Sequence, residues 1–505
     1  MLDRFLEHKI QKKFQLYQIL KSNNSISFKT LTKTLKSSES SVRSLIEILN
    51  DNFNGLAKIE KNQQFLSLKT NDNVDTLKLS HRIYNESLVL QCLKFLITND
   101  TLEPFSTFTK EAFLSKSSSY RIKNICQEYL HSIGLTIDNN KIVGEEYRIR
   151  FLIALLYYKY DIDCCNIDFD SIQLARKFIL STNNTINLKF LENTVNEYGY
   201  FECLLILSWK RKSNPVFLRK NNDFQKLKKS FVYGNMKLYL KKVIEKELNI
   251  NFHENDYEYI YLAYCNTNSC VLADKWTQYD IDYIHQVIFG NTKFSNLLQR
   301  FVFKFEKNLA DNRAMKVALI YFYKKFLFEL QCISPDICFY LNSTNDPLTL
   351  KTFHHVSKLL DSWKKDNDIQ YPISTDHIHY LSIQIESILH QFLNPIPLIL
   401  VSDLIVELEV MKLVLLRNFS SQRITITQFL LNTKKIDFLH NCQDCIIIVN
   451  QKFKNTMLDI NTSNNNMIIF VNVEFNSIDI SKIQNALSYY EEQSFLRYNF
   501  IAAKK

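Results

Sequence analysis

Residues 28–50, FKTLTKTLKSSESSVRSLIEILN, hold the pattern on which the predicted fold depends. Phe28, Leu31 and Leu35 mark one face of a short helix, and a serine-rich turn at residues 37–41 follows it. The next apolar residues recur at i, i+3, i+4 and i+7, the spacing of a second helix with one buried face: Val42, Leu45, Ile46 and Leu49. Serines in the turn can cap that helix. Residues 55–69, GLAKIEKNQQFLSLK, alternate around a turn at 61–63, which predicts a β-hairpin.

A second stretch, beginning at Phe105, repeats this order. Its first apolar face is predicted from Phe108, Ala112 and Phe113, and its turn from the serines at 117–119. The second helix has the same spacing, at Ile122, Ile125, Cys126 and Tyr129. Residues 134–144, GLTIDNNKIVG, predict the hairpin, with its turn at 138–140. We expect a longer helix before each copy, over residues 2–20 and 82–97. This order is typical of a winged helix-turn-helix, whose second helix enters the major groove of DNA.

Positive charge is concentrated at the first copy. The chain has a formal net charge of +10, and residues 1–70 hold twelve Lys and Arg against six Asp and Glu. Such a basic end is the footprint of a phosphate-binding module, although a merely solvated surface and a protein-contact role also fit, the latter mainly for the second copy. The side chains predicted to face DNA are Lys36, Ser40, Ser41, Arg43 and Ser44 in the first copy and Ser118, Ser119, Tyr120, Arg121, Lys123 and Asn124 in the second.

Several classes of protein are excluded by composition. The six glycines are never clustered, which argues against dinucleotide and nucleoside-triphosphate loops and against the nucleophile elbow of hydrolases. Kinase and classical nucleotide-enzyme functions are therefore largely excluded. We predict neither an enzymatic activity nor a cofactor for this chain. Apolar runs are interrupted by charges, so we expect no membrane segment. Eleven cysteines without a framework and a charged start without a signal-peptide core indicate a cytoplasmic protein with reduced thiols.

The middle of the chain is predicted to be helical. Residues 144–162, GEEYRIRFLIALLYYKYDI, form a long helix with an acidic first turn, and the pattern stays helical to about residue 393. Four histidines gather late in this region: His354, His355, His377 and His379. Because no nearby Cys or Glu set completes a metal shell, we predict no metal site and expect structural or exposed roles from the pattern alone.

The C-terminal part alternates strands and helices. We predict strands at residues 398–401, 424–429, 445–449 and 467–473, and helices at 404–418 and 480–490, which together favour a small parallel α/β sheet. The pair Cys442 and Cys445 could suggest zinc or redox chemistry. It has no second pair and leads into a strand, so a structural role is favoured.

The predicted fold class is a mainly α multidomain protein. Its divisions are a winged helix-turn-helix at residues 1–70, a second helix-turn-helix domain at 71–163, helical bundles at 164–275 and 276–395, and the α/β domain at 396–505.

This order of modules, together with the segment at 144–162, resembles the Mga/AtxA family of transcription regulators over essentially the whole chain. The resemblance implies that the bundles are phosphotransferase-system regulation domains and that the last domain is similar to enzyme IIB. It also implies a DNA-binding activator, often of virulence or global metabolic genes, that self-associates through its C-terminal part.

The resemblance also implies regulation by histidine phosphorylation, with a phosphocarrier of the phosphotransferase system as donor. In the second bundle His354, His355, His377 and His379 are the candidates, and His379 is favoured. In the first bundle Cys265 stands where the phosphorylated histidine of the family would be. Residues 401–403, Val-Ser-Asp, replace the phosphocysteine loop of enzyme IIB, so phosphotransfer by that domain is expected to be lost.

We therefore expect a cytoplasmic regulator that binds double-stranded DNA as a homodimer or a higher homo-oligomer. Two alternatives are a component of the phosphotransferase system and a protein-interaction scaffold that does not bind DNA.

Overall fold

The structure is a computed structural model. It describes all residues except 1, 63, 72–73, 75, 183–194, 268–270, 336–346, 432–441, 458–465 and 502–505. The chain is mostly helical and divides into two compact units. Unit 1 comprises Met1–Lys304 and Asn308–Gln384, and unit 2 comprises Phe305–Lys307 and Ile385–Lys505. The finer division into five domains stays a prediction. None of the helices in the described part of the chain has the length and apolar character needed to span a bilayer.

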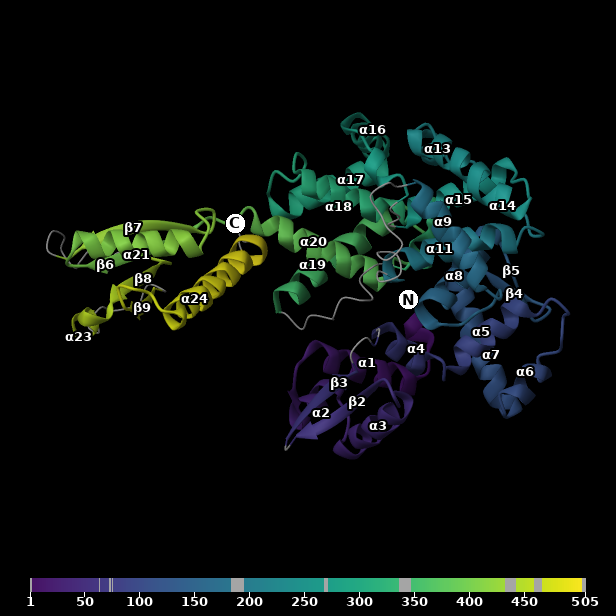
Figure 1. Cartoon of the computed structure of the whole chain (residues 1–505), viewed down its shortest axis with the longest axis horizontal. Coiled ribbons are helices and arrows are strands. Elements are labelled where there is room, and N and C mark those ends of the chain that lie inside the picture. The colour runs from purple at the N-terminus through teal and green to yellow at the C-terminus, as the bar shows by residue number, and fades with distance from the viewer. Residues whose placement is uncertain are drawn as a thin grey trace. The chain divides into compact units, whose positions relative to one another are not determined.

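Unit 1 begins with a winged helix-turn-helix, here called module 1 (Figure 1). Its elements are η1 (Leu2–Phe5), α1 (His8–Ser22), β1 (Ile26–Ser27), α2 (Phe28–Leu35), α3 (Glu39–Asn52), β2 (Ala57–Asn62) and β3 (Phe65–Thr70). The strands form an antiparallel sheet in the order β1-β3-β2. Leu31, Leu35, Val42 and Leu49 are buried, so the predicted helix pair and hairpin are confirmed. The predicted helix over 2–20 is instead a short 3₁₀ turn followed by α1.

Module 2 repeats this order. Its elements are α4 (Thr76–Tyr84), α5 (Leu88–Thr98), α6 (Ser106–Glu111), α7 (Lys116–Ser132), β4 (Thr136–Asp138), β5 (Lys141–Val143) and α8 (Glu146–Tyr160). The hairpin turn is formed by Asn139 and Asn140, both with positive φ, as two-residue hairpin turns require. The single helix predicted over 82–97 is wrong, because α4 ends at Tyr84 and Ser87 caps a new helix.

The rest of unit 1 consists of helices. In chain order they are α9 (Phe169–Thr182), α11 (Val195–Lys210), α12 (Asn222–Leu227), α13 (Phe231–Leu240), the π-helix η2 (Lys241–Glu245), α14 (Lys246–Leu248), α15 (Glu254–Asn266), η3 (Ala273–Lys275), α16 (Gln278–Phe289), α17 (Thr292–Phe305), α18 (Arg313–Lys324), η4 (Leu327–Cys332), α19 (Pro347–Asp366) and α20 (Thr375–His390). Helix α11 packs against α8, α9 and α15. Helix α8 is buried along nearly its whole length, including the basic side chains of Arg148, Arg150 and Lys159.

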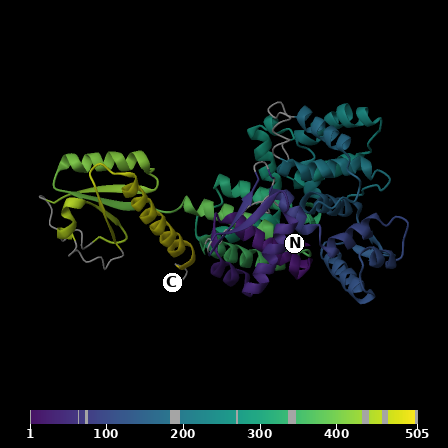
Figure 2. The same cartoon turned by 60° about the horizontal axis from the view of Figure 1, so that its bottom comes forward.

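Unit 2 contains a four-stranded parallel sheet in the order β7-β6-β8-β9. Its elements are β6 (Ile396–Ser402), α21 (Ile405–Asn418), β7 (Ile424–Leu430), β8 (Ile446–Asn450), η6 (Gln451–Phe453), α23 (Lys454–Met457), β9 (Met467–Val471), α24 (Ser477–Leu496) and the π-helix η7 (Arg497–Ile501). Helices α21 and α24 share one apolar core with a single face of the sheet (Figures 1 and 2). The predicted parallel α/β arrangement of this part is confirmed.

Candidate nucleic-acid interface

The second helix of module 1 presents a polar outer face. Ser38 caps α3 by accepting a hydrogen bond from the amide of Ser41 (3.3 Å), which fixes where the helix begins. Glu39, Ser40, Ser41, Arg43 and Ser44 are exposed, whereas the opposite face is core. The predicted residues of this copy, Lys36 included, therefore lie at the surface. Arg43 pairs with Glu39 at 3.7 Å, an exposed contact that water weakens, so its guanidinium can exchange this partner for another anion.

A cationic cluster links α3 to the wing. Arg43 lies 5.1 Å from the ring centre of Phe28, and Lys61 of β2 lies 5.8 Å from the same ring. Phe28 thus holds a helix cation and a wing cation close together. Lys58 and Lys69 of the hairpin are also exposed. The charge argument from sequence did not single out these wing lysines individually.

The turn between the paired helices has the same form in both modules. Lys36 directly follows α2 and has φ +47°, and Phe113 follows α6 after Ala112 and has φ +51°. In both turns the next amide, of Ser37 or Leu114, donates to a carbonyl five residues earlier (3.2 and 3.0 Å). This is the Schellman motif, whose left-handed residue is usually glycine. The N-cap serine follows two residues later in each, at Ser38 and Ser115. Equivalent positions are therefore 77 residues apart.

This spacing corrects two predictions for module 2. Ser119 is equivalent to the core residue Val42 and is fully buried, so it is not on the exposed face. Its hydroxyl donates to the carbonyl of Lys116 (2.9 Å), which satisfies it inside the helix. Phe113 was expected in the first apolar face but is 96% exposed. The serines at 117–119 lie in the first turn of α7 and not in the preceding turn, because Ser115 is the cap.

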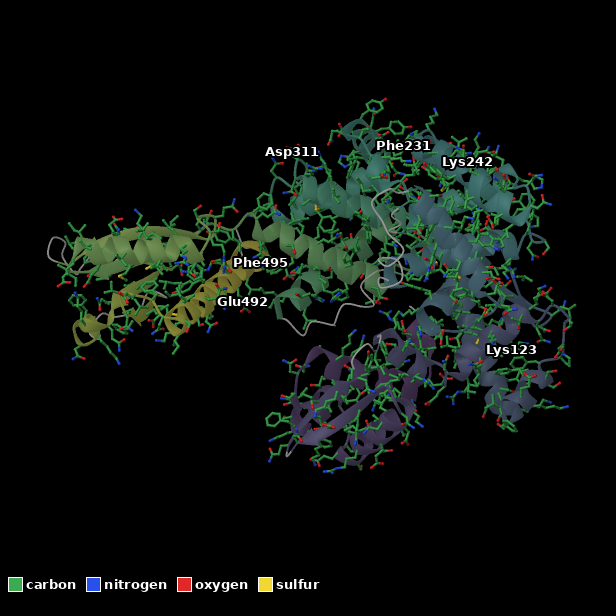
Figure 3. All side chains as sticks on the ribbon, viewed as in Figure 1. Lys123, Phe231, Lys242, Asp311, Glu492 and Phe495 are labelled. Atoms are coloured by element: carbon green, nitrogen blue, oxygen red, sulfur yellow. The ribbon has the colours of Figure 1, made fainter. Side chains whose placement is uncertain are left out.

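The other predicted residues of module 2 divide into two groups. Ser118, Tyr120, Arg121 and Asn124 are exposed on one side of α7. Lys123 extends from α7 (Figure 3). It is half-buried. It donates to the Asn140 side chain (2.7 Å) and lies 4.9 Å from the ring centre of Phe105, so it fastens the hairpin turn to α7.

Ion pairs of the buried Lys159 join module 1 to α8 and α8 to the start of α20. Lys159 of α8 contacts Asp3 of module 1 (2.6 Å) and Asp376 at the start of α20 (3.8 Å). Burial by itself would raise the pKa of Asp3, but the charge of Lys159 holds it well below its ordinary value. Arg4 also donates to the hydroxyl of Thr375 (2.5 Å). The first residues of module 1 are therefore held by α8 and by α20.

The four candidate histidines have different environments. His377 is buried, and its Nε2 lies 2.9 Å from the carbonyl of Ser334. His379 is half-buried, and burial lowers its pKa. His354 is exposed on α19, and His355 lies in an open groove of about 550 Å³ between α17 and α19. Burial, followed by the charge of Lys304, lowers the pKa of His355.

The groove around His355 is basic. Besides His355 it is lined by Arg300, Lys304 and Lys358, together with Asn296, Gln299, Phe303, Leu359 and Ser362. Arg300 donates to Asp366 (2.5 Å) and to Ser362 (3.0 Å), so its charge is already paired. The two lysines are the cations that an added phosphoryl group would meet.

In unit 2 the loop after β6 forms a closed ion network. Ser402 is buried and donates to Glu407, while Lys452 contacts both Asp403 (2.6 Å) and Glu407 (2.9 Å). No thiol stands in this loop. The sulfur of Cys445 donates to Asn466 (3.3 Å), and burial raises the pKa of Cys445 to about 12. Within the described ranges, no three His, Cys, Asp or Glu side chains are placed to hold a metal ion.

Comparison with known families identifies the second module. Residues 72–157 match the family model described as "Mga helix-turn-helix domain". The matched segment runs from the start of module 2 into α8. Over these residues it confirms the predicted resemblance to the Mga family, and it supports a DNA-binding transcription regulator. No curated protein matches the chain.

Proposed function

Because the chain carries an Mga helix-turn-helix domain, we propose that it is a transcription regulator, and specifically an activator, that binds promoter DNA through both modules. The observation that carries this proposal is the duplicated geometry: two serine-capped second helices, each with a buried face and an exposed polar face. Arg43 and Arg121 suit guanine edges, and Asn124 suits adenine. The wing lysines suit phosphate.

Regulation is proposed to act through histidine phosphorylation of the second bundle. Among the four candidates the environment of His355 supports it best, because its groove is open and holds Lys304 and Lys358. A phosphoryl group adds about −1.5 to −2 charges at pH 7 and would draw both lysines towards it. His377 is buried, which disfavours its phosphorylation. The exposure of His379 is intermediate between those of His377 and an open surface site.

Self-association is proposed to occur through unit 2, the part that we liken to enzyme IIB. Helix α21 exposes a row of apolar side chains, defined here as the α21 outer face: Ile405, Val406, Val410, Leu413 and Leu416. Monomeric proteins rarely leave such contiguous apolar surface in water, and a helix face of this kind suits an isologous homodimer. The ion network after β6 supports the view that phosphotransfer has been lost in this domain, which argues against a phosphotransferase enzyme.

The test uses the full chain, because α8 buries Arg148, Arg150 and Lys159 against helices that a truncation at residue 160 would remove. Binding to a pool of genomic duplex fragments is titrated with salt for the wild type, Arg43→Ala and Arg121→Ala. We expect a steep salt slope, and for each variant weaker binding and altered selection of sequence from the pool. A wild type that binds no duplex at low salt would support the scaffold alternative.

A further inference from the structure

The turn before α7 exposes an aromatic side chain in an unfavourable conformation. Phe113 is 96% exposed and has φ +51°. Bulky residues avoid this left-handed region, and a phenylalanine normally gains by burial. The turn requires only a residue with a left-handed backbone conformation here, and glycine adopts that conformation without strain. Two unfavourable features at one surface position point to a role outside the folding of the chain.

The equivalent residue of module 1 indicates where this position faces. Lys36 has the same conformation and the same two-residue distance to the N-cap serine of the second helix. In a helix-turn-helix the start of that helix contacts base edges, so the preceding turn lies at the lip of the major groove. Module 1 places a cation at this point, and module 2 places an aromatic ring.

The surroundings of Phe113 favour nucleic acid over an apolar protein surface. Lys110, Lys116 and Arg121 are exposed nearby in the sequence, against the single acid Glu111. The cap residue Ser115 and the first-turn residues Ser117 and Ser118 are also exposed. The cations and hydroxyls can contact the phosphates of a DNA backbone, while the apolar side chain contacts an apolar group beside them.

We propose that Phe113 makes an apolar contact with bound duplex DNA at the edge of the major groove, against a thymine methyl group or the adjacent deoxyribose. This inference rests on the proposed DNA-binding function. The contact adds affinity without neutralising a phosphate. It would give module 2, whose net charge is lower than that of module 1, affinity that charge alone does not supply.

The experiment compares full-length wild type, Phe113→Ala and Phe113→Lys on one duplex selected by the wild type. We expect Phe113→Ala to weaken binding about tenfold, the size of one good base-edge contact, with an unchanged slope of log K against log salt. Phe113→Lys should recover affinity and steepen the slope by about 0.9, because it adds one phosphate contact. Phe217→Ala, which removes another exposed phenylalanine (70%), should bind as the wild type does.

Replacing thymines of the duplex by deoxyuridine distinguishes the two sources of the contact. If the methyl group is the partner, one substitution weakens the wild type and leaves Phe113→Ala unaffected; if deoxyribose is the partner, no substitution does so. The melting temperature of Phe113→Ala should equal or exceed that of the wild type, because the side chain is exposed.

Equal affinity of Phe113→Ala and the wild type would overturn the inference while leaving the proposed function intact. A change in oligomeric state with unchanged DNA affinity would instead assign Phe113 to a protein contact and would also overturn it. Absence of duplex binding by the wild type would remove the proposed function and this inference together.

Discussion

Replacing Arg148 by methionine should destabilise unit 1 far more than the same change at Arg219. Both guanidinium groups contact Glu145, at 3.2 Å and 2.8 Å. Arg219 is 64% exposed, whereas Arg148 is 1% exposed and donates to the carbonyls of Phe328 and Ile133, each at 3.0 Å. The two variants therefore separate the effect of burial from the effect of the shared ion pair.

The magnitude follows from the buried carbonyls. Methionine keeps much of the volume of Arg148 but leaves both oxygens without this donor, at a cost of about 1–2 kcal/mol each. We expect Arg148→Met to lower the free energy of unfolding by about 2–4 kcal/mol. Arg219→Met removes an exposed pair worth about 0–1 kcal/mol.

Urea unfolding followed by tryptophan fluorescence measures this difference directly. The three tryptophans, at residues 209, 276 and 363, all lie in unit 1, so the signal reports that unit. A midpoint for Arg148→Met no lower than that for Arg219→Met would refute the argument that the buried carbonyls depend on Arg148.

Three further predictions concern regulation, assembly and pH. Leu413→Asp on the α21 outer face should convert the dimer to a monomer in sedimentation, whereas Leu238→Asp, at a similarly exposed site on α13, should not; a monomeric wild type would contradict the proposal. Incubation with a phosphocarrier system should label the wild type and not His355→Ala, and equal labelling of the two would move the site elsewhere. Asp3 has a lowered pKa, so its stabilising effect is complete above the unfolded-state value of about 3.9 and is lost as the pH falls through the lower folded-state value. The stability difference between the wild type and Asp3→Asn should therefore be largest near neutral pH and shrink towards acid pH, and a constant difference would contradict this.

Local patterns predicted the elements well where the evidence for an element lies within the element itself. The spacing of Val42, Leu45 and Leu49 predicts a buried face. Ser38 is the N-cap of α3, in the serine-rich turn that directly precedes this helix. The strands of unit 2 were predictable because buried parallel strands form continuous apolar runs, such as residues 446–449.

One failure, the single helix predicted over residues 82–97, came from a contact between distant residues. The break between α4 and α5 contains no proline or glycine. Instead, the carboxylate of Glu7, 80 residues away, accepts hydrogen bonds from the hydroxyl of Ser87 (2.7 Å) and the amide of Val89 (3.0 Å), which starts a new helix there. Ser87 is a local cap signal, but no local pattern contains the contact with Glu7.

The predictions for Ser119 and Phe113 failed for a different reason. Polarity assigned the serine to the surface and the phenylalanine to the core, and the structure reverses both. Aligning the two modules at their N-cap serines would have predicted both, since Ser119 then falls on Val42 and Phe113 on Lys36. In a repeated motif the position within the repeat is therefore a better guide to exposure than the residue type.

The attachment of module 1 offers a route by which the proposed regulation would reach DNA. Helix α20 begins with Thr375 and Asp376, and these residues contact Arg4 and Lys159. Lys159 in turn holds Asp3. A displacement of the start of α20 changes the partners of these side chains before it alters either recognition helix, because α3 and α7 keep their own caps and cores. We therefore expect a regulatory signal to change how module 1 is held relative to module 2, and so which spacing of half-sites is bound, while the bases preferred by each module stay the same.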